Sequence, residues 1–165
     1  MTDDSDETGP LEVLAVLDLL RRTGCRAWVA GGWGVDALLG RRTRAHRDLD
    51  LALDASGSDA ALAALTASGY VVETDWLPVR VELHRPGHGR VDVHPVVFEP
   101  DGNGVQAGFD GEVFRYPRTA FTTGSIVGTT VGCLSAELQL TFRQGYPPRP
   151  VDHHDLALLH GLTTV

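Results

Sequence analysis

The 165-residue chain lacks a long apolar run, and nothing in it approaches the roughly 18 consecutive apolar residues that a membrane-spanning helix needs. Cysteine is scarce: only Cys25 and Cys133 occur, without the spacing of a metal site or of a disulfide framework. Basic residues are outnumbered, with 14 Lys and Arg against 22 Asp and Glu and a net charge of −8. These absences argue against a membrane protein, a disulfide-rich secreted domain and a nucleic-acid binder, which needs a basic surface. They favour a cytoplasmic protein that acts on a small molecule, for which a cationic compound would suit the acidic balance.

The composition of the chain is enough for one hydrophobic core. Hydrophobic residues make up 42% of the sequence and charged residues 22%, as in soluble globular domains. The first nine residues, MTDDSDETG, are acidic and polar, so we expect a disordered leader at 1–9 and not a signal peptide. A single domain that ends in short helices is expected at 10–165.

The most informative stretch runs from Trp28 to Leu53, WVAGGWGVDALLGRRTRAHRDLDLAL. A short apolar strand at 27–30 is followed by Gly31 and Gly32 and then by a helix-length segment at 33–39. Glycine permits a positive φ and lets a backbone approach a ligand closely. Free N–H groups at a turn that leads into a helix bind anions. The two glycines are therefore candidate contacts to the phosphates of a nucleotide.

The segment DLDLAL alternates acidic and apolar residues, which predicts a strand. In such a strand Asp48 and Asp50 share one face, about 7 Å apart, and Leu49, Leu51 and Leu53 share the other. Two parallel carboxylates repel each other unless a cation lies between them, and Mg²⁺ prefers oxygen ligands of this kind. A polar face on a half-exposed strand is the alternative interpretation, but the preceding glycines favour a site for a metal and a nucleotide.

At these residues the sequence resembles a known family. GGWGVDALLG followed by RxHxDLDL is similar to the DNA polymerase β-like nucleotidyltransferase superfamily, and within it to the lincosamide nucleotidyltransferases and aminoglycoside adenylyltransferases. The resemblance implies an α/β (α+β) fold with a small mixed, twisted sheet flanked by helices. It also implies Mg²⁺-dependent transfer of a nucleoside monophosphate, with ATP as the expected donor, to a hydroxyl of a small molecule such as a lincosamide or an aminoglycoside. Pyrophosphate would be released.

A third carboxylate is expected from a later strand. The turn at 86–89 separates two alternating segments, which predicts a hairpin whose returning strand is 90–97. On that strand Asp92 and His94 face one way. The resemblance implies that Asp92 joins Asp48 and Asp50 in holding one or two Mg²⁺ ions, or takes the proton of the acceptor hydroxyl, or does both. A surface carboxylate at a strand end is the alternative.

A competing hypothesis is a zinc site built from His84, His88, Asp92 and His94. Histidine and aspartate are common zinc ligands, but here they straddle a Pro-Gly turn without the spacing of a closed site.

Arg44 and His46 lie on the same face as the Asp pair if the chain is already extended at residue 44. Arginine matches phosphate oxygens with a two-pronged geometry, so Arg44 is a candidate contact to the nucleotide. His46 is a second candidate in the cofactor site, where it would orient an aspartate; packing alone is the alternative. For the other arginines of this segment we expect a solvated loop.

The run CLSAELQLTFRQGYPPRPVDHHDLALL resembles the C-terminal part of the lincosamide-type enzymes. It predicts a helix at 136–145, with Ser135 as its N-cap, and a last helix at 151–162. By the resemblance, Glu137 and Gln139 line the acceptor or the nucleotide side of the site. The alternative is that Glu137 only supports the start of the helix and Gln139 only fills a boundary position.

Several questions stay open at the level of sequence. A nucleotidyltransferase that modifies a protein or an RNA, as in toxin–antitoxin pairs, is one alternative function, and a non-catalytic binder of a nucleotide or small ligand is another. The acceptor and the preferred base of the nucleotide are not specified. Larger relatives add a helical domain that shapes the acceptor pocket, and a homodimer would follow here if a second subunit completes that pocket. The remaining expected elements are helices at 11–23 and 58–68, strands at 70–74, 79–85 and 112–116, a loop at 100–107, and β structure with turns at 119–132.

Overall fold

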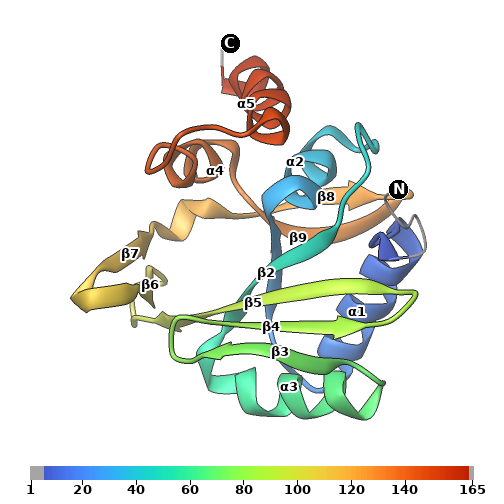
Figure 1. Cartoon of the computed structure of the whole chain (residues 1–165). Coiled ribbons are helices and arrows are strands. Elements are labelled where there is room, and N and C mark those ends of the chain that lie inside the picture. Colours follow the sequence, from blue (N-terminus) through green and yellow to red (C-terminus); the bar gives the residue numbers. More distant parts are fainter. Residues whose placement is uncertain (1–5, 164–165) are drawn as a thin grey trace.

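A computed structural model describes residues 6–163 of the chain (Figure 1). Its strands are β1 (Ala27–Ala30), β2 (Asp48–Asp54), β3 (Val71–Trp76), β4 (Arg80–Arg85), β5 (Gly89–Phe98), β6 (Gly104–Ala107), β7 (Val113–Tyr116), β8 (Phe121–Ile126) and β9 (Thr129–Leu134). Its helices are α1 (Pro10–Arg22), α2 (Gly31–Leu39), α3 (Ser58–Ala67), α4 (Ala136–Phe142) and α5 (Pro150–Thr163), with short 3₁₀ turns η2 (Ala55–Gly57), η3 (Phe109–Gly111) and η4 (Arg118–Ala120).

The strands form one mixed sheet in the order β3-β4-β5-β2-β1-β9-β8, to which β6 and β7 are attached through β5. The central strand β2 is antiparallel to β1 and parallel to β5. The expected mixed sheet with flanking helices is therefore confirmed, and the hairpin expected from the Pro-Gly turn is the antiparallel pair β4–β5.

The apolar side of β2 forms the middle of the main core. Leu49, Leu51 and Leu53 are each 0% exposed and pack together with side chains of α1 and α3. Burying each leucine contributes about 1.5–3 kcal/mol, which fixes the register of the strand. Because side chains alternate along a strand, this burial forces Asp48 and Asp50 onto the opposite side.

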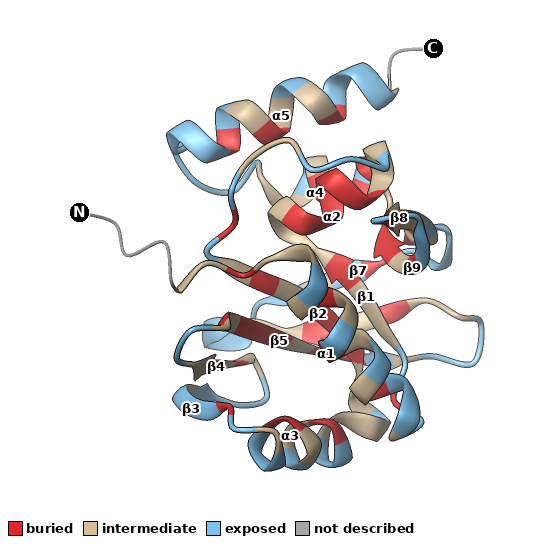
Figure 2. Ribbon diagram, turned by 90° about the vertical axis from the view of Figure 1, so that its right-hand side faces the viewer, coloured by how far each residue is buried: buried red, intermediate tan, exposed pale blue. Residues whose placement is uncertain are grey.

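Helix α2 begins two residues earlier than expected, at Gly31, so that both glycines belong to its first turn. It ends at Gly40, which adopts a left-handed conformation with φ of 72° and caps the helix. Figure 2 shows most of α2 as buried, and Trp33 is among the largest fully enclosed side chains. A helix so enclosed holds its N-terminus in a fixed place next to β2.

The expected disordered leader is wrong for residues 6–9, and residues 1–5 lie outside the described part of the chain. Thr8 is only 1% exposed, and its hydroxyl donates to the carbonyl of Arg47 at 3.0 Å. Its own carbonyl accepts a hydrogen bond from the indole of Trp33 at 3.1 Å. The acidic composition suggested a free tail, but these contacts tie the segment to the start of β2.

The expected loop at 100–107 is also partly wrong, because its last four residues form β6. This strand pairs with β5 on one side and with β7 on the other.

Within residues 6–163, no helix has both the length and the apolar character that crossing a membrane requires.

Candidate active site

Three carboxylates meet on one face of the sheet. In the parallel pairing of β2 with β5, Asp50 lies directly opposite Asp92, and Asp48 is two residues away on the same side of β2. All three line a cavity of about 730 Å³. The structure thus brings together the carboxylates that the sequence predicted as a metal site.

Negative charge exceeds positive charge in this cluster. Burial, followed by the charges of Asp50 and Asp92, raises the pKa of Asp48 from 3.8 to about 7. Burial also raises the pKa of Asp92, although Arg80 holds one of its oxygens, Oδ2, at 2.7 Å. A divalent cation among these side chains would relieve both the repulsion and the missing solvation.

His94, two residues after Asp92 on the same face of β5, lies next to the carboxylates. Its Nε2 lies 3.7 Å from Oδ1 of Asp50 and 3.6 Å from Oδ2 of Asp92. One ligand atom from each of these three residues falls within 4.8 Å of the others. Burial works against protonation of His94, but the two carboxylates raise its pKa above the usual 6.5. The sequence offered a signal for this residue, because His94 shares the face of Asp92.

The competing zinc hypothesis is wrong as a set of four. His84 binds the carboxylate of Asp6 at 2.7 Å, and His88 lies 2.8 Å from that of Glu12. Both pairs lie outside the cavity that Asp92 and His94 line.

The donor set fits a hard divalent cation. Oδ1 of Asp92 is buried and has no hydrogen-bond partner among the described residues. Carboxylate oxygens dominate the cluster, and Mg²⁺ prefers such ligands. A buried carboxylate oxygen without a partner is costly unless a ligand completes it.

The two glycines let the start of α2 approach the carboxylates. Gly31 has φ of 59°, and a Cβ at this position would overlap the carboxylate of Asp50. A Cβ on Gly32 would overlap the guanidinium of Arg44. Both glycines line the cavity, so the N-terminal turn of α2, with its free N–H groups, borders the same space as the acidic cluster.

Arg44 and His46 differ in their positions. Arg44 lines the cavity, but its Nε and Nη2 donate to the two oxygens of Asp155 at 3.0 and 2.9 Å. His46 is 2% exposed and does not line the cavity; its Nε2 lies 2.6 Å from Oδ2 of Asp36 and its ring packs on Trp33. His46 therefore contacts an aspartate, as one of the two interpretations expected, but that aspartate is Asp36 of α2 and not a carboxylate of the cavity.

Glu137 and Gln139 point to different sides of α4, because residues two apart on an α-helix are separated by about 200°. Gln139 is 1% exposed, lines the cavity and donates to the carbonyl of Leu134 at 2.9 Å. Glu137 is exposed in the first turn of the helix and lines a separate small depression. The expected place of Glu137 in the main site is wrong, because packing of Gln139 inward turns it away.

An aromatic wall that the sequence did not reveal completes the cavity. We define it as Phe114 and Tyr116 of β7 together with Phe142 of α4. The ring of Phe142 lies 5.1 Å from that of Tyr116 and 6.0 Å from that of Phe114. Tyr116 donates through its hydroxyl to Oε1 of Gln106 at 2.5 Å. The alternation of β7, which puts Phe114 and Tyr116 on one face, was the available signal.

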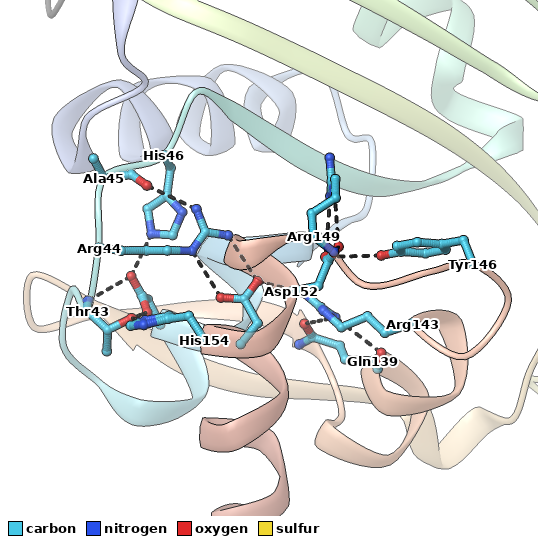
Figure 3. A network of polar contacts seen from close by, with 12 residues as sticks. Thr43, Arg44, Ala45, His46, Gln139, Arg143, Tyr146, Arg149, Asp152 and His154 are labelled. Atoms are coloured by element: carbon cyan, nitrogen blue, oxygen red, sulfur yellow. Dashed lines mark hydrogen bonds and ion pairs between the residues drawn. The ribbon is translucent and has the colours of Figure 1, made fainter. Parts of the chain in front are cut away.

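Helix α5 contributes two buried carboxylates that bind arginines at the same cavity (Figure 3). Asp155 binds Arg44 and also Nη2 of Arg143 at 3.2 Å. Asp152 accepts from Nε of Arg149 at 3.0 Å, and this bond above all lowers its pKa to about 2. The far C-terminal helix is thereby joined to the loop that precedes β2.

Residues 12–159 match the family model described as aminoglycoside-2''-adenylyltransferase. The chain belongs to this family. It is 34% identical over 152 residues to a lincosamide resistance protein of Staphylococcus haemolyticus, a match that covers 92% of this chain and 94% of that protein. The resemblance to the polymerase β-like superfamily, and within it to the lincosamide and aminoglycoside adenylyltransferases, is confirmed, and the protein is an antibiotic nucleotidyltransferase.

Solved structures of the family agree with the fold. The crystal structure of the lincosamide antibiotic adenylyltransferase LnuA with lincomycin bound superposes with a TM-score of 0.88 at 33% identity, over 96% of this chain and 100% of that one. That of ANT(2")-Ia in complex with adenylyl-2"-tobramycin gives a TM-score of 0.73 at 22% identity, over 93% and 88% of the chains, and supports the fold alone.

Replacing Gly31 by alanine should disturb the acidic cluster more than it disturbs the fold. Gly31 and Gly40 both have a positive φ, but only at Gly31 would the added Cβ meet a neighbour, the carboxylate of Asp50. Each substitution should cost about 1–2 kcal/mol of stability through its backbone conformation. Turnover should fall strongly in Gly31→Ala and stay near wild type in Gly40→Ala. Equal turnover in the two variants, compared at matched folded fractions, would show that the close approach of Gly31 to Asp50 does not matter for the reaction.

Without divalent cations, stability should fall as the pH rises toward neutrality. Between the usual pKa of 3.8 and the raised value of about 7, Asp48 keeps a proton in the folded protein that the unfolded chain has released. Unfolding then releases a proton, so the free energy of unfolding decreases through this window and levels off above it. Thermal unfolding in EDTA should show this fall, at roughly 2–4 °C per kcal/mol, and Mg²⁺ should reverse it. Asp48→Asn should flatten the slope; an unchanged slope would refute the assignment to Asp48.

Proposed function

We propose that the protein transfers the AMP group of ATP to a hydroxyl of a lincosamide, with Mg²⁺ as the metal, and releases pyrophosphate. The observation that carries the chemistry is the register that sets Asp50 opposite Asp92 beside the N-terminus of α2. The choice of acceptor is supported by the similarity to a lincosamide resistance protein, which extends over nearly the whole of both chains.

In this proposal each group of the site has a separate task. Asp48, Asp50 and Asp92 would hold Mg²⁺, which supplies neutralisation of the phosphate charge and orients the acceptor. The N–H groups at Gly31 and Gly32 bind phosphate oxygens. Phosphoryl-type transfers depend mainly on such positioning and charge stabilisation.

The proton of the acceptor hydroxyl goes to Asp92. Arg80 donates to Oδ2 of this carboxylate at 2.7 Å and keeps it in place during the transfer. The acceptor oxygen forms a bond to the α-phosphorus of ATP. The bond from that phosphorus to the oxygen shared with the β-phosphorus breaks, and pyrophosphate leaves with its electron pair.

The aromatic wall suits an acceptor with a large apolar part. Phe114, Tyr116 and Phe142 offer ring surface on the side of the cavity that β7 and α4 form. Lincosamides combine a sugar with an apolar proline-derived part and carry a single basic nitrogen. The sugar hydroxyls would face the acidic cluster while the apolar part packs on the rings.

The charges of the cavity favour the same acceptor over an aminoglycoside, the second candidate that the family assignment supplies. An aminoglycoside carries several ammonium groups and needs free carboxylates. Outside the acidic cluster, the cavity carboxylates lie next to arginines: Asp152 binds Arg149 at 3.0 Å, Asp155 binds two arginines, and Glu82 lies 3.8 Å from Arg80. With Mg²⁺ bound, few unpaired acidic groups would remain for a polycation.

We place the reaction in the cytoplasm, where ATP is available and the two buried free thiols, Cys25 and Cys133, would stay reduced. A homodimer stays a prediction from the sequence, although the chain itself contributes an aromatic wall to the cavity.

Pyrophosphate release in the presence of Mg²⁺ tests the reaction. We expect release from ATP with lincomycin or clindamycin, and much less with tobramycin, because of the charge balance described above. Asp50→Asn should lower turnover at least about a hundredfold, the scale of losing an electrostatic group at a reaction centre. Asp59→Asn, an exposed change of the same charge in α3, serves as the control. Release with tobramycin but not with lincomycin would replace the acceptor, and full activity of Asp50→Asn would reject the metal site.

Removing one ring from the aromatic wall should weaken acceptor binding selectively. Phe114→Ala should raise the KM for lincomycin roughly tenfold, because a lost apolar contact costs about 1–2 kcal/mol, and should leave the KM for ATP unchanged. Phe109→Ala, an exposed phenylalanine outside the cavity, is the matched control. Equal KM values in the two variants would show that the wall does not contact the acceptor.

A further inference from the structure

An arginine that lines the cavity has an unused hydrogen-bond donor. Among residues 6–163, four buried side-chain atoms lack a hydrogen-bond partner, and two of them, on Glu7 and His88, take part in ion pairs. The other two are Oδ1 of Asp92 and Nε of Arg143, and both residues line the cavity. An acceptor at one place and a donor at another point to a ligand with both a cationic and an anionic part, such as a metal-bound phosphate.

The Arg143 side chain is held firmly without using this donor. It is 8% exposed, its Nη1 donates to the carbonyl of Gln139 at 3.1 Å, and its Nη2 donates to Asp155 at 3.2 Å. A buried arginine with its ends fixed in this way loses little further freedom when a ligand binds.

The same carboxylate, Asp155, holds the guanidinium of Arg44 through two hydrogen bonds. Asp155 is 3% exposed, so it brings two cations together in a place with little water. Asp155 supplies one negative charge for two arginines and does not neutralise both, although the charges of Asp36 and Asp48 also act on Arg44. We call Arg44 and Arg143 the arginine pair. Their guanidinium groups repel each other unless an anion binds between them.

The arginine pair borders the first turn of α2. A Cβ on Gly32 would overlap the Arg44 guanidinium, so the cation and the free N–H groups of the helix start adjoin the same space. Guanidinium groups and helix N-termini both bind phosphate oxygens. The acidic cluster lies on the other side of Gly31, against which the carboxylate of Asp50 packs.

We propose that Arg44 and Arg143, set by Asp155, form the subsite for the terminal phosphates of the nucleotide and so for the pyrophosphate that leaves. This inference rests on the proposed nucleotidyl transfer for the identity of the anion. Arg143 binds through its free Nε–H, and Arg44 through N–H groups that Asp155 and the carbonyl of Ala45 leave unused. Asp155 is a positioning residue: it does not touch the phosphates but fixes the two groups that do.

Titration of inorganic pyrophosphate in the presence of Mg²⁺, without acceptor or nucleotide, tests the subsite directly by calorimetry. Arg143→Ala should weaken binding at least about tenfold, the scale of losing a hydrogen bond to a charged group. Arg143→Lys keeps the charge but loses Nε–H and the fork, so it should recover only part of the affinity. Arg26→Ala changes the net charge equally at an ion pair with Asp54 outside the cavity, and should bind as the wild type does.

Asp155→Asn separates positioning from simple charge. Removing one negative charge next to two arginines should strengthen anion binding if electrostatics alone decides. If Asp155 positions the arginine pair, affinity for pyrophosphate should instead fall several-fold, and in turnover the KM for ATP should rise while the KM for the acceptor stays unchanged. Asp155→Glu, which keeps the negative charge and both carboxylate oxygens, should recover part of the affinity. Thermal unfolding measured in parallel identifies any variant that does not fold.

Failure of this inference can be told apart from failure of the proposed function. If no antibiotic supports pyrophosphate release but the wild type binds pyrophosphate and Arg143→Ala does not, the subsite stands and the acceptor must be replaced. Pyrophosphate affinity within twofold of wild type in Arg143→Ala would overturn the subsite. The subsite would also be overturned if Asp155→Asn raised only the KM for the acceptor, or if this variant bound pyrophosphate more tightly than the wild type.

Discussion

The parallel pairing of β2 with β5 is the constraint on which the site depends. It places Asp50 opposite Asp92 with Asp48 close by, an arrangement that the carboxylates themselves oppose. Burial on the opposite face of β2 outweighs this repulsion, because the leucines that alternate with the aspartates are fully buried. Each contributes about 1.5–3 kcal/mol to the stability of the fold. A strand with one apolar and one acidic face can therefore hold repelling groups together, and a cation is the natural means of relieving them.

Opposite charges organise the rest of the cavity in zones. The acidic cluster lies in the first halves of β2 and β5, with Arg80 bound to Asp92. Farther along, the signs reverse: Asp155 serves two arginines and is itself nearly excluded from solvent. A ligand that carries a metal ion at one end and negative phosphates at the other complements such a division, since each end meets the opposite charge in a medium of reduced dielectric constant.

How much of this could be predicted from the sequence depends on the range over which each feature is fixed. The two-residue alternation of β2 and of β5 is local, and it correctly placed Asp48, Asp50 and Asp92 on shared faces. The bond between Arg44 and Asp155 joins residues 111 positions apart, and no local pattern contains it. The inward turn of Gln139 and the outward turn of Glu137 follow from which side of α4 meets the cavity, which a short helix with few apolar residues does not specify.

The contrast between local patterns and distant contacts also explains why the sequence predicted the reaction but did not specify the acceptor. Metal-binding carboxylates must stand at fixed separations, and a strand achieves this with a spacing that survives in the sequence as Asp-x-Asp. An apolar wall needs only ring surface at the right depth, which short segments can supply in many combinations; here β7 and α4 do so. Because such surface tolerates substitution far better than a ligand geometry does, members of one fold can keep the reaction and change the antibiotic. Specificity in this protein is therefore expected to reside in the segments whose sequence signal is weakest.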